Sequence, residues 1–127
     1  MILKAREIKN LNDTIQILLP LQLKMPFAYE VACIAREVRE NDMMISTMRQ
    51  EIIERYAKRD ENGHVIVNSE NGTVDVDEGK IPELNKELDG LFNREIELES
   101  NKIKLDDIKD LDLTVGQIEA LIPLIEK

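Results

Sequence analysis

Residues 26–57, PFAYEVACIAREVRENDMMISTMRQEIIERYA, place apolar side chains at alternating spacings of four and three residues. Because an α-helix turns once in 3.6 residues, this spacing keeps those side chains on one side of a helix. We therefore predict a single helix over about 26–57, far longer than the average globular helix of about 11–12 residues. The members of this apolar stripe are Phe27, Val31, Ile34, Val38, Ile45, Met48 and Ile52.

The same spacing places one polar residue, Asn41, on the stripe between Val38 and Ile45. A polar group on an apolar face costs about 1–3 kcal/mol unless it has a hydrogen-bond partner. Two arrangements remain open. In the first, Asn41 pairs with its counterpart in a second copy of the chain and fixes the register. In the second, the helix bends or rotates, so that Asn41 faces water while Met43 and Met44 take over the contact.

The stripe is long relative to the two short helices available to cover it, so we predict that it also contacts a protein partner. A homo-oligomer, with a dimer joined through the long helix, is the expected assembly. Methionines near the middle of the helix add a pliant surface that suits binding. The predicted interface consists of Phe27, Val31, Ile34, Val38, Asn41, Met44, Ile45, Met48 and Ile52.

Helical spacing of apolar residues also predicts shorter helices over about 5–19, 82–93 and 115–122. Pro20 ends the first of these, and Pro26 suits the first turn of the long helix, where its missing N–H is not needed. The last short helix opens on the sequence of a capping box, Thr-x-x-Gln, beginning at Thr114.

Two β-hairpins are expected between the helices. Asn-Gly pairs at 62–63 and 71–72 flank β-favouring residues and predict a hairpin over about 64–76. Alternating apolar and charged residues predict a second hairpin over about 95–105. Its buried face would comprise Ile96, Leu98, Ile103 and Leu105.

These elements define the predicted fold class. It is mainly α with small β-hairpins (α+β), in which a long central helix packs against shorter helices. At 127 residues the chain has the length of one domain, which we assign to 1–127.

Composition limits the partners. Twenty-six acidic and seventeen basic residues give a net charge of −9. Proteins bind nucleic acids and anionic membranes largely through Lys and Arg, so we expect neither partner. The chain has no Trp, two Phe and two Tyr, which leaves few rings for stacking on bases. No stretch approaches the roughly 18 apolar residues of a membrane span, so we expect a cytoplasmic protein.

Residues suited to catalysis or metal binding are few. The single Cys33 and single His64 are too few for a structural zinc site. A helical Cys33 is also poorly placed to form a catalytic pair with a histidine in a turn. Acidic residues around Asp60 and Asp75 lack the ligand spacing of a calcium loop, and no glycine-rich phosphate loop is present. We therefore expect no catalytic residue, no metal and no cofactor, and hence not an enzyme.

Several segments carry a family resemblance. The long helix is followed by Tyr-Ala-Lys-x-Asp-Glu-x-Gly at 56–63, and Glu-Ile-Glu-Leu at 95–98 precedes Ile-Lys-Leu-Asp-Asp-Ile at 103–108. The chain nears its end with Leu-Thr-x-x-x-Ile-x-Ala-Leu at 113–121. In these motifs the chain resembles small tailed-phage (prophage) proteins of uncharacterised function. The resemblance spans most of the chain, implies a phage origin and assigns no active-site residue.

Three classes of function are compatible with these features. We favour a non-enzymatic interaction protein, a helical adaptor or an inhibitor that binds a host or phage protein. Small acidic phage proteins can act by occupying a basic site on a host protein. The alternatives are a virion structural or assembly component, such as a chaperone, and a small-ligand-binding protein with a pocket between protomers.

Overall fold

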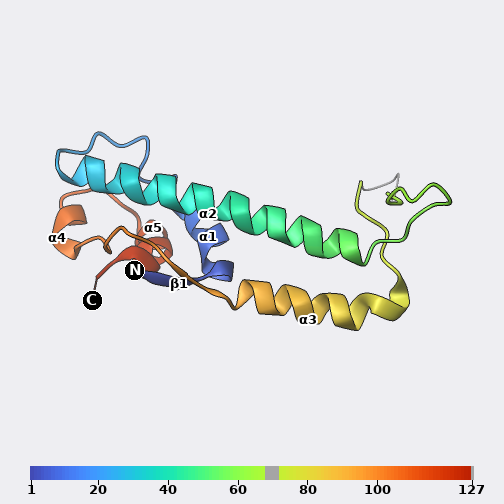
Figure 1. Ribbon diagram of the computed structural model, residues 1–127. Coiled ribbons are helices and arrows are strands. Elements are labelled where there is room, and N and C mark those ends of the chain that lie inside the picture. Colours follow the sequence, from blue (N-terminus) through green and yellow to red (C-terminus); the bar gives the residue numbers. More distant parts are fainter. Residues whose placement is uncertain (68–71, 127) are drawn as a thin grey trace. The chain divides into compact units, whose positions relative to one another are not determined.

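The computed structural model describes residues 1–67 and 72–126 (Figure 1). It is mainly helical with a two-stranded antiparallel sheet, and it confirms the predicted class, a long helix packed against shorter ones. The helices are α1 (Ala5–Ile15), α2 (Phe27–Arg55), α3 (Ile81–Phe92), α4 (Leu105–Ile108) and α5 (Val115–Leu121). Short 3-10 helices cover Glu78–Lys80 and Ile122–Leu124, and the strands are β1 (Ile2–Lys4) and β2 (Glu95–Glu97).

The chain divides into two compact units. Unit 1 comprises Met1–Asp42 and the chain from Glu95 onward, and unit 2 comprises Met43–Arg94. In the described residues, sixteen buried apolar side chains belong to unit 1 and four belong to unit 2. Because apolar burial is the main favourable term in folding, unit 1 contains most of the stabilising core.

The core of unit 1 is assembled from one face of each helix. α1 buries Ala5, Ile8, Leu11 and Ile15, which its helical spacing places on one side. This side packs against α5, where Leu121 is fully buried. The first part of α2 contributes its apolar stripe, and Asn12 of α1 donates a hydrogen bond to Asp42 of α2 at 3.2 Å.

The predicted hairpin over 95–105 is wrong. Strand β2 pairs antiparallel with β1 instead, with Ile96 opposite Leu3. Ile103 forms a parallel bridge with Ile125, and Leu105 begins α4 with its side chain exposed. Alternation reports which side of a strand is buried, but it does not identify the strand with which it pairs.

The predicted hairpin over 64–76 is confirmed in its pairing. Val67 and Val74 form an antiparallel bridge. The chain that leaves α2 joins them, since Ala57 bridges Val76 and Arg59 bridges Val65. This small β region is therefore three segments wide rather than two.

The turns of this β region are described in part. At the first Asn-Gly pair, Gly63 has a φ of +79°, in the left-handed region that glycine adopts at little cost. Asp60 closes the same turn by accepting hydrogen bonds from the backbone N–H groups of Asn62 and His64, each at 2.9 Å. The predicted turn at 71–72 involves residues 68–71, which lie outside the described residues.

Candidate functional site

Six of the nine predicted interface residues are buried within the single chain. They are Phe27, Val31, Ile34, Val38, Ile45 and Ile52. Since the chain covers these side chains itself, the argument that a second copy must cover the stripe no longer holds. The structure therefore corrects the proposed interface at these six positions, whereas self-association as such stays a prediction.

The middle of α2 differs from both arrangements considered for Asn41. Its side-chain nitrogen donates to the carbonyl oxygen of Glu37 at 2.8 Å, so Asn41 needs no partner from another chain. Met44 and the neighbouring Met43 are exposed and do not take over a core contact, and Met48 is half-buried. No residue of α2 between Val38 and Ile45 is buried, and the boundary between the two units falls within this gap.

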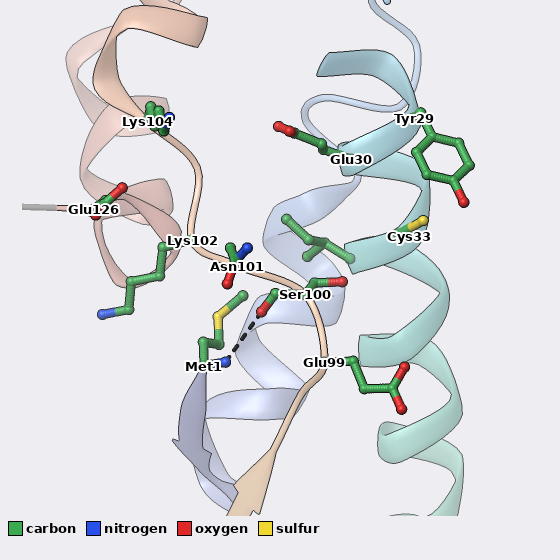
Figure 2. Close-up of a pocket in the computed structure, with 11 residues that line it drawn as sticks. Met1, Tyr29, Glu30, Cys33, Glu99, Ser100, Asn101, Lys102, Lys104 and Glu126 are labelled. Carbon is green, nitrogen blue, oxygen red and sulfur yellow. Dashed lines mark hydrogen bonds between the residues drawn. The ribbon is translucent and has the colours of Figure 1, made fainter. Parts of the chain in front are cut away.

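A cavity of about 690 Å³ lies in unit 1 (Figure 2). Tyr29, Glu30 and Cys33 of α2 line one side, and the segment from Glu99 to Lys104 lines the other. Carboxylates and lysine ammonium groups are mixed around it, and its described lining contains no histidine to activate Cys33. The serine hydroxyl in this lining, that of Ser100, donates to the Glu37 carboxylate, and no histidine of the described lining accompanies this pair.

Glu37 fixes the chain segment beside this cavity. Its carboxylate accepts hydrogen bonds from the backbone N–H groups of Glu99, at 2.7 Å, and Ser100, at 3.0 Å, and also from the Ser100 hydroxyl. The nitrogen of Met1 donates to the carbonyl oxygen of Ser100 at 3.2 Å (Figure 2). Glu37 and the nitrogen of Met1 therefore fix the position of the segment around Ser100, which lines the cavity.

A second cavity is apolar. It has a volume of about 400 Å³ and lies between the connector that follows α1 and the first turns of α2. Its lining residues are Leu18, Leu19, Leu21, Gln22, Leu23, Ala28, Val31 and Ala32. We call this the connector groove; Leu19, Leu21 and the adjacent Met25 are exposed beside it.

A further apolar surface lies on the side of α5 that faces away from the core, and we call it the α5 outer face. It consists of Val115 and Ile118 of α5 and of Ile122, the first residue of the 3-10 helix that follows; all three are exposed, and the Val115 side chain is 83% exposed. The spacing of apolar residues predicted the helix over 115–122 but did not identify this face. Apolar residues at 115, 118 and 122 lie on a different side of the helix from Leu121, and this spacing could have indicated a second contact.

Two further acidic residues of the β region have structural partners. Asp75 lies 3.9 Å from the Lys58 ammonium, and Asp77 accepts a hydrogen bond from the backbone N–H of Gly79 at 3.1 Å. Within residues 1–67 and 72–126, no group of three or more histidine, cysteine or acidic side chains is arranged to hold a metal ion.

Tyr56 has the one clearly shifted ionisation among the described residues. Partial burial raises the pKa of its phenol above the ordinary value of 10.0, and a hydrogen bond to Glu87, together with the charge of that carboxylate, raises the pKa further. The positive charge of Arg55, which lies 3.5 Å from Glu87, acts in the opposite direction.

This shift predicts a pH dependence in unit 2. In a Tyr29→Phe background, the absorbance of Tyr56 should titrate above the ordinary tyrosine range, and Glu87→Gln should lower its midpoint. Because the folded pKa exceeds the unfolded one, the associated stability is fully present below pH 10.0 and is lost as the pH rises through the folded pKa. An unchanged midpoint in Glu87→Gln would contradict this account.

The described part of the chain contains no helix long and apolar enough to cross a membrane. No family model, curated protein or solved structure matches the chain. The resemblance to small tailed-phage proteins therefore stays a prediction.

Proposed function

We propose that this chain is a non-enzymatic protein-binding module, an adaptor or an inhibitor that acts on a host or phage protein. The observation that supports this function is the apolar surface exposed on unit 1, at the connector groove and at the α5 outer face. Unit 1 has a well-buried core. The exposure of these side chains is therefore not the result of a poorly formed core. Contiguous exposed apolar surface is typical of sites that bind other proteins.

Charge favours a basic partner. The net charge of −9 creates a negative potential that attracts basic proteins and speeds their encounter. The mixed charges of the larger cavity support small-ligand binding less well, because they do not create a field of one sign. Placement in the bacterial cytoplasm, where such a partner would be met, belongs to the same proposal.

An affinity-tagged chain produced in bacterial cells tests this function. After brief cross-linking, we expect one cellular or phage protein to be recovered in stoichiometric amount. Ile66→Asp provides a control, since Ile66 is exposed in the β region of unit 2 and should leave recovery unchanged. Failure to recover any protein, together with a thermal shift of several degrees on adding nucleotides, would contradict the proposal and favour a ligand-binding protein.

A further inference from the structure

The α5 outer face lacks the polar residues that a solvent-facing helix surface normally carries. The exposed residues from 115 to 123 are Val115, Gly116, Ile118, Glu119, Ala120, Ile122 and Pro123. Glu119 is the one charged member of this set, whereas the outer face of a surface helix is normally polar and charged. The exposed surface of α5 is therefore unusually apolar for a helix that faces water.

The apolar members form a stripe rather than a scatter. Val115, Ile118 and Ile122 are separated by three and four residues, so they lie along one side of the helix over about two turns. Glu119 is four residues after Val115 and is therefore its neighbour on the same side. The stripe is long enough to contact about two turns of another helix.

The helix beneath this stripe is firmly held. Leu121 is fully buried on its inner side, and Thr114 and Gln117 form the predicted capping box. The backbone N–H of Gln117 donates to the Thr114 hydroxyl at 3.2 Å, and the N–H of Thr114 donates to the Gln117 side chain at 2.9 Å. A binding surface on a rigid element loses little conformational freedom when a partner binds.

Acidic residues predominate in the sequence that contains the stripe. Residues 105–127 contain six acidic and two basic side chains. Asp110 and Asp112, both exposed, precede α5, and Glu119 lies within its exposed side. A partner that covers this face therefore has to supply apolar side chains at its centre and positive charge at its rim.

We propose that the α5 outer face docks a basic amphipathic helix of a partner protein. Leucine-like side chains of that helix cover Val115, Ile118 and Ile122, while its lysines or arginines lie near Asp112 and Glu119. This inference rests on the proposed protein-binding function and specifies its site and the chemistry of its partner. The contact is short, so it is a transient one, formed rapidly and weakened by salt.

Two other occupants fit the charges less well. A second copy docked face to face by a two-fold axis would bring Glu119 and Asp112 against the same acidic surface. An anionic membrane would be repelled by the same carboxylates. A basic helix is the occupant that satisfies both the apolar stripe and its acidic rim.

The test uses the full chain and a synthetic peptide of fourteen residues, in which leucine and lysine alternate with helical periodicity. Two matched peptides carry glutamate in place of lysine, or serine in place of leucine. NMR titration of the isotope-labelled chain should show the leucine–lysine peptide shifting the signals of residues 115–122, with an affinity in the micromolar range. Both matched peptides should bind at least about tenfold more weakly, because each lacks one of the two required features.

Variants of the chain locate the site. Val115→Ser combined with Ile122→Ser should lower the affinity for the leucine–lysine peptide at least about tenfold. The thermal stability should not change, because both residues are exposed. The matched control, Leu21→Ser with Met25→Ser at the connector groove, should leave the affinity within about twofold.

Several results would overturn the docking site. The proposal is contradicted if the leucine–lysine peptide shifts the NMR signals of the connector groove in place of those of residues 115–122. It is also contradicted if the serine peptide binds as tightly as the leucine–lysine peptide. It also fails if a recovered cellular partner is lost from the connector-groove variant but retained by the α5 variant, and the protein-binding function then still stands. Conversely, if the unchanged chain recovers no partner, that result counts against the protein-binding function. The peptide titration then tests separately whether the α5 outer face binds a basic helix.

Discussion

Leu121→Ala is expected to lower the free energy of unfolding by about 2–5 kcal/mol. Leu121 is fully buried on the inner side of α5, where that helix packs against α1. Truncation removes apolar contacts and leaves a cavity that the surrounding helices fill only in part. Chemical denaturation followed by far-UV circular dichroism measures the change directly.

The adjacent residue provides the control for this prediction. Ile122 is 52% exposed, so Ile122→Ala should change the free energy of unfolding by no more than about 0.5 kcal/mol. The two variants remove aliphatic side chains from neighbouring positions and differ chiefly in burial. Equal losses would show that the α5 outer face is covered in solution, and would remove the basis of the docking surface as well.

Glu37→Ala is expected to lower the free energy of unfolding by about 1.5–3 kcal/mol, the range for hydrogen bonds to a charged group. The Glu37 carboxylate accepts from the backbone N–H groups of Glu99 and Ser100, which alanine would leave without this acceptor. The bonds join α2 to a segment more than sixty residues further along the chain. Loss of the carboxylate should therefore also speed amide hydrogen exchange at residues 99 and 100.

Glu40→Ala is the matched control for Glu37, one helical turn further along α2. Its carboxylate lies 3.4 Å from the Arg36 guanidinium, and both side chains are largely exposed. Exposed ion pairs contribute about 0–1 kcal/mol to stability, so the free energy of unfolding of this variant should be close to that of the unchanged protein. A Glu37 variant no less stable than the Glu40 variant would contradict the assigned role.

Helices could be predicted from the sequence because their signals are local. The spacing in 26–57 predicted α2, which the structure bounds at Phe27–Arg55, and the spacing in 82–93 predicted α3, bounded at Ile81–Phe92. The predicted helix over 115–122 is α5, while the one over 5–19 ends earlier, at Ile15, and continues as turns. Hydrogen bonds within a helix connect residues four apart, so a short window of sequence contains most of the information.

Strand partners and surface exposure could not be predicted in the same way. Residues 95–97 alternate as a strand should, but their partner is at the start of the chain, and nothing in the spacing identifies β1. The stripe of α2 was recognised as apolar, yet the pattern alone could not show whether this chain or a second copy covers it. The α5 outer face was overlooked for the same reason. Periodicity shows which residues share a face of a helix, but it does not show whether that face contacts the core, a partner or solvent.

The pairing of β1 with β2 has a consequence for biosynthesis. Leu3 and Ile96 are opposite each other, so the sheet of unit 1 forms only after the ribosome has added more than ninety further residues. Unit 2 is continuous in sequence and is complete before that point. Translation proceeds at about 5–20 residues per second. For several seconds, therefore, α1 and the beginning of α2 lack the segments that later cover them, and chaperones that recognise exposed aliphatic side chains have that interval in which to bind the nascent chain.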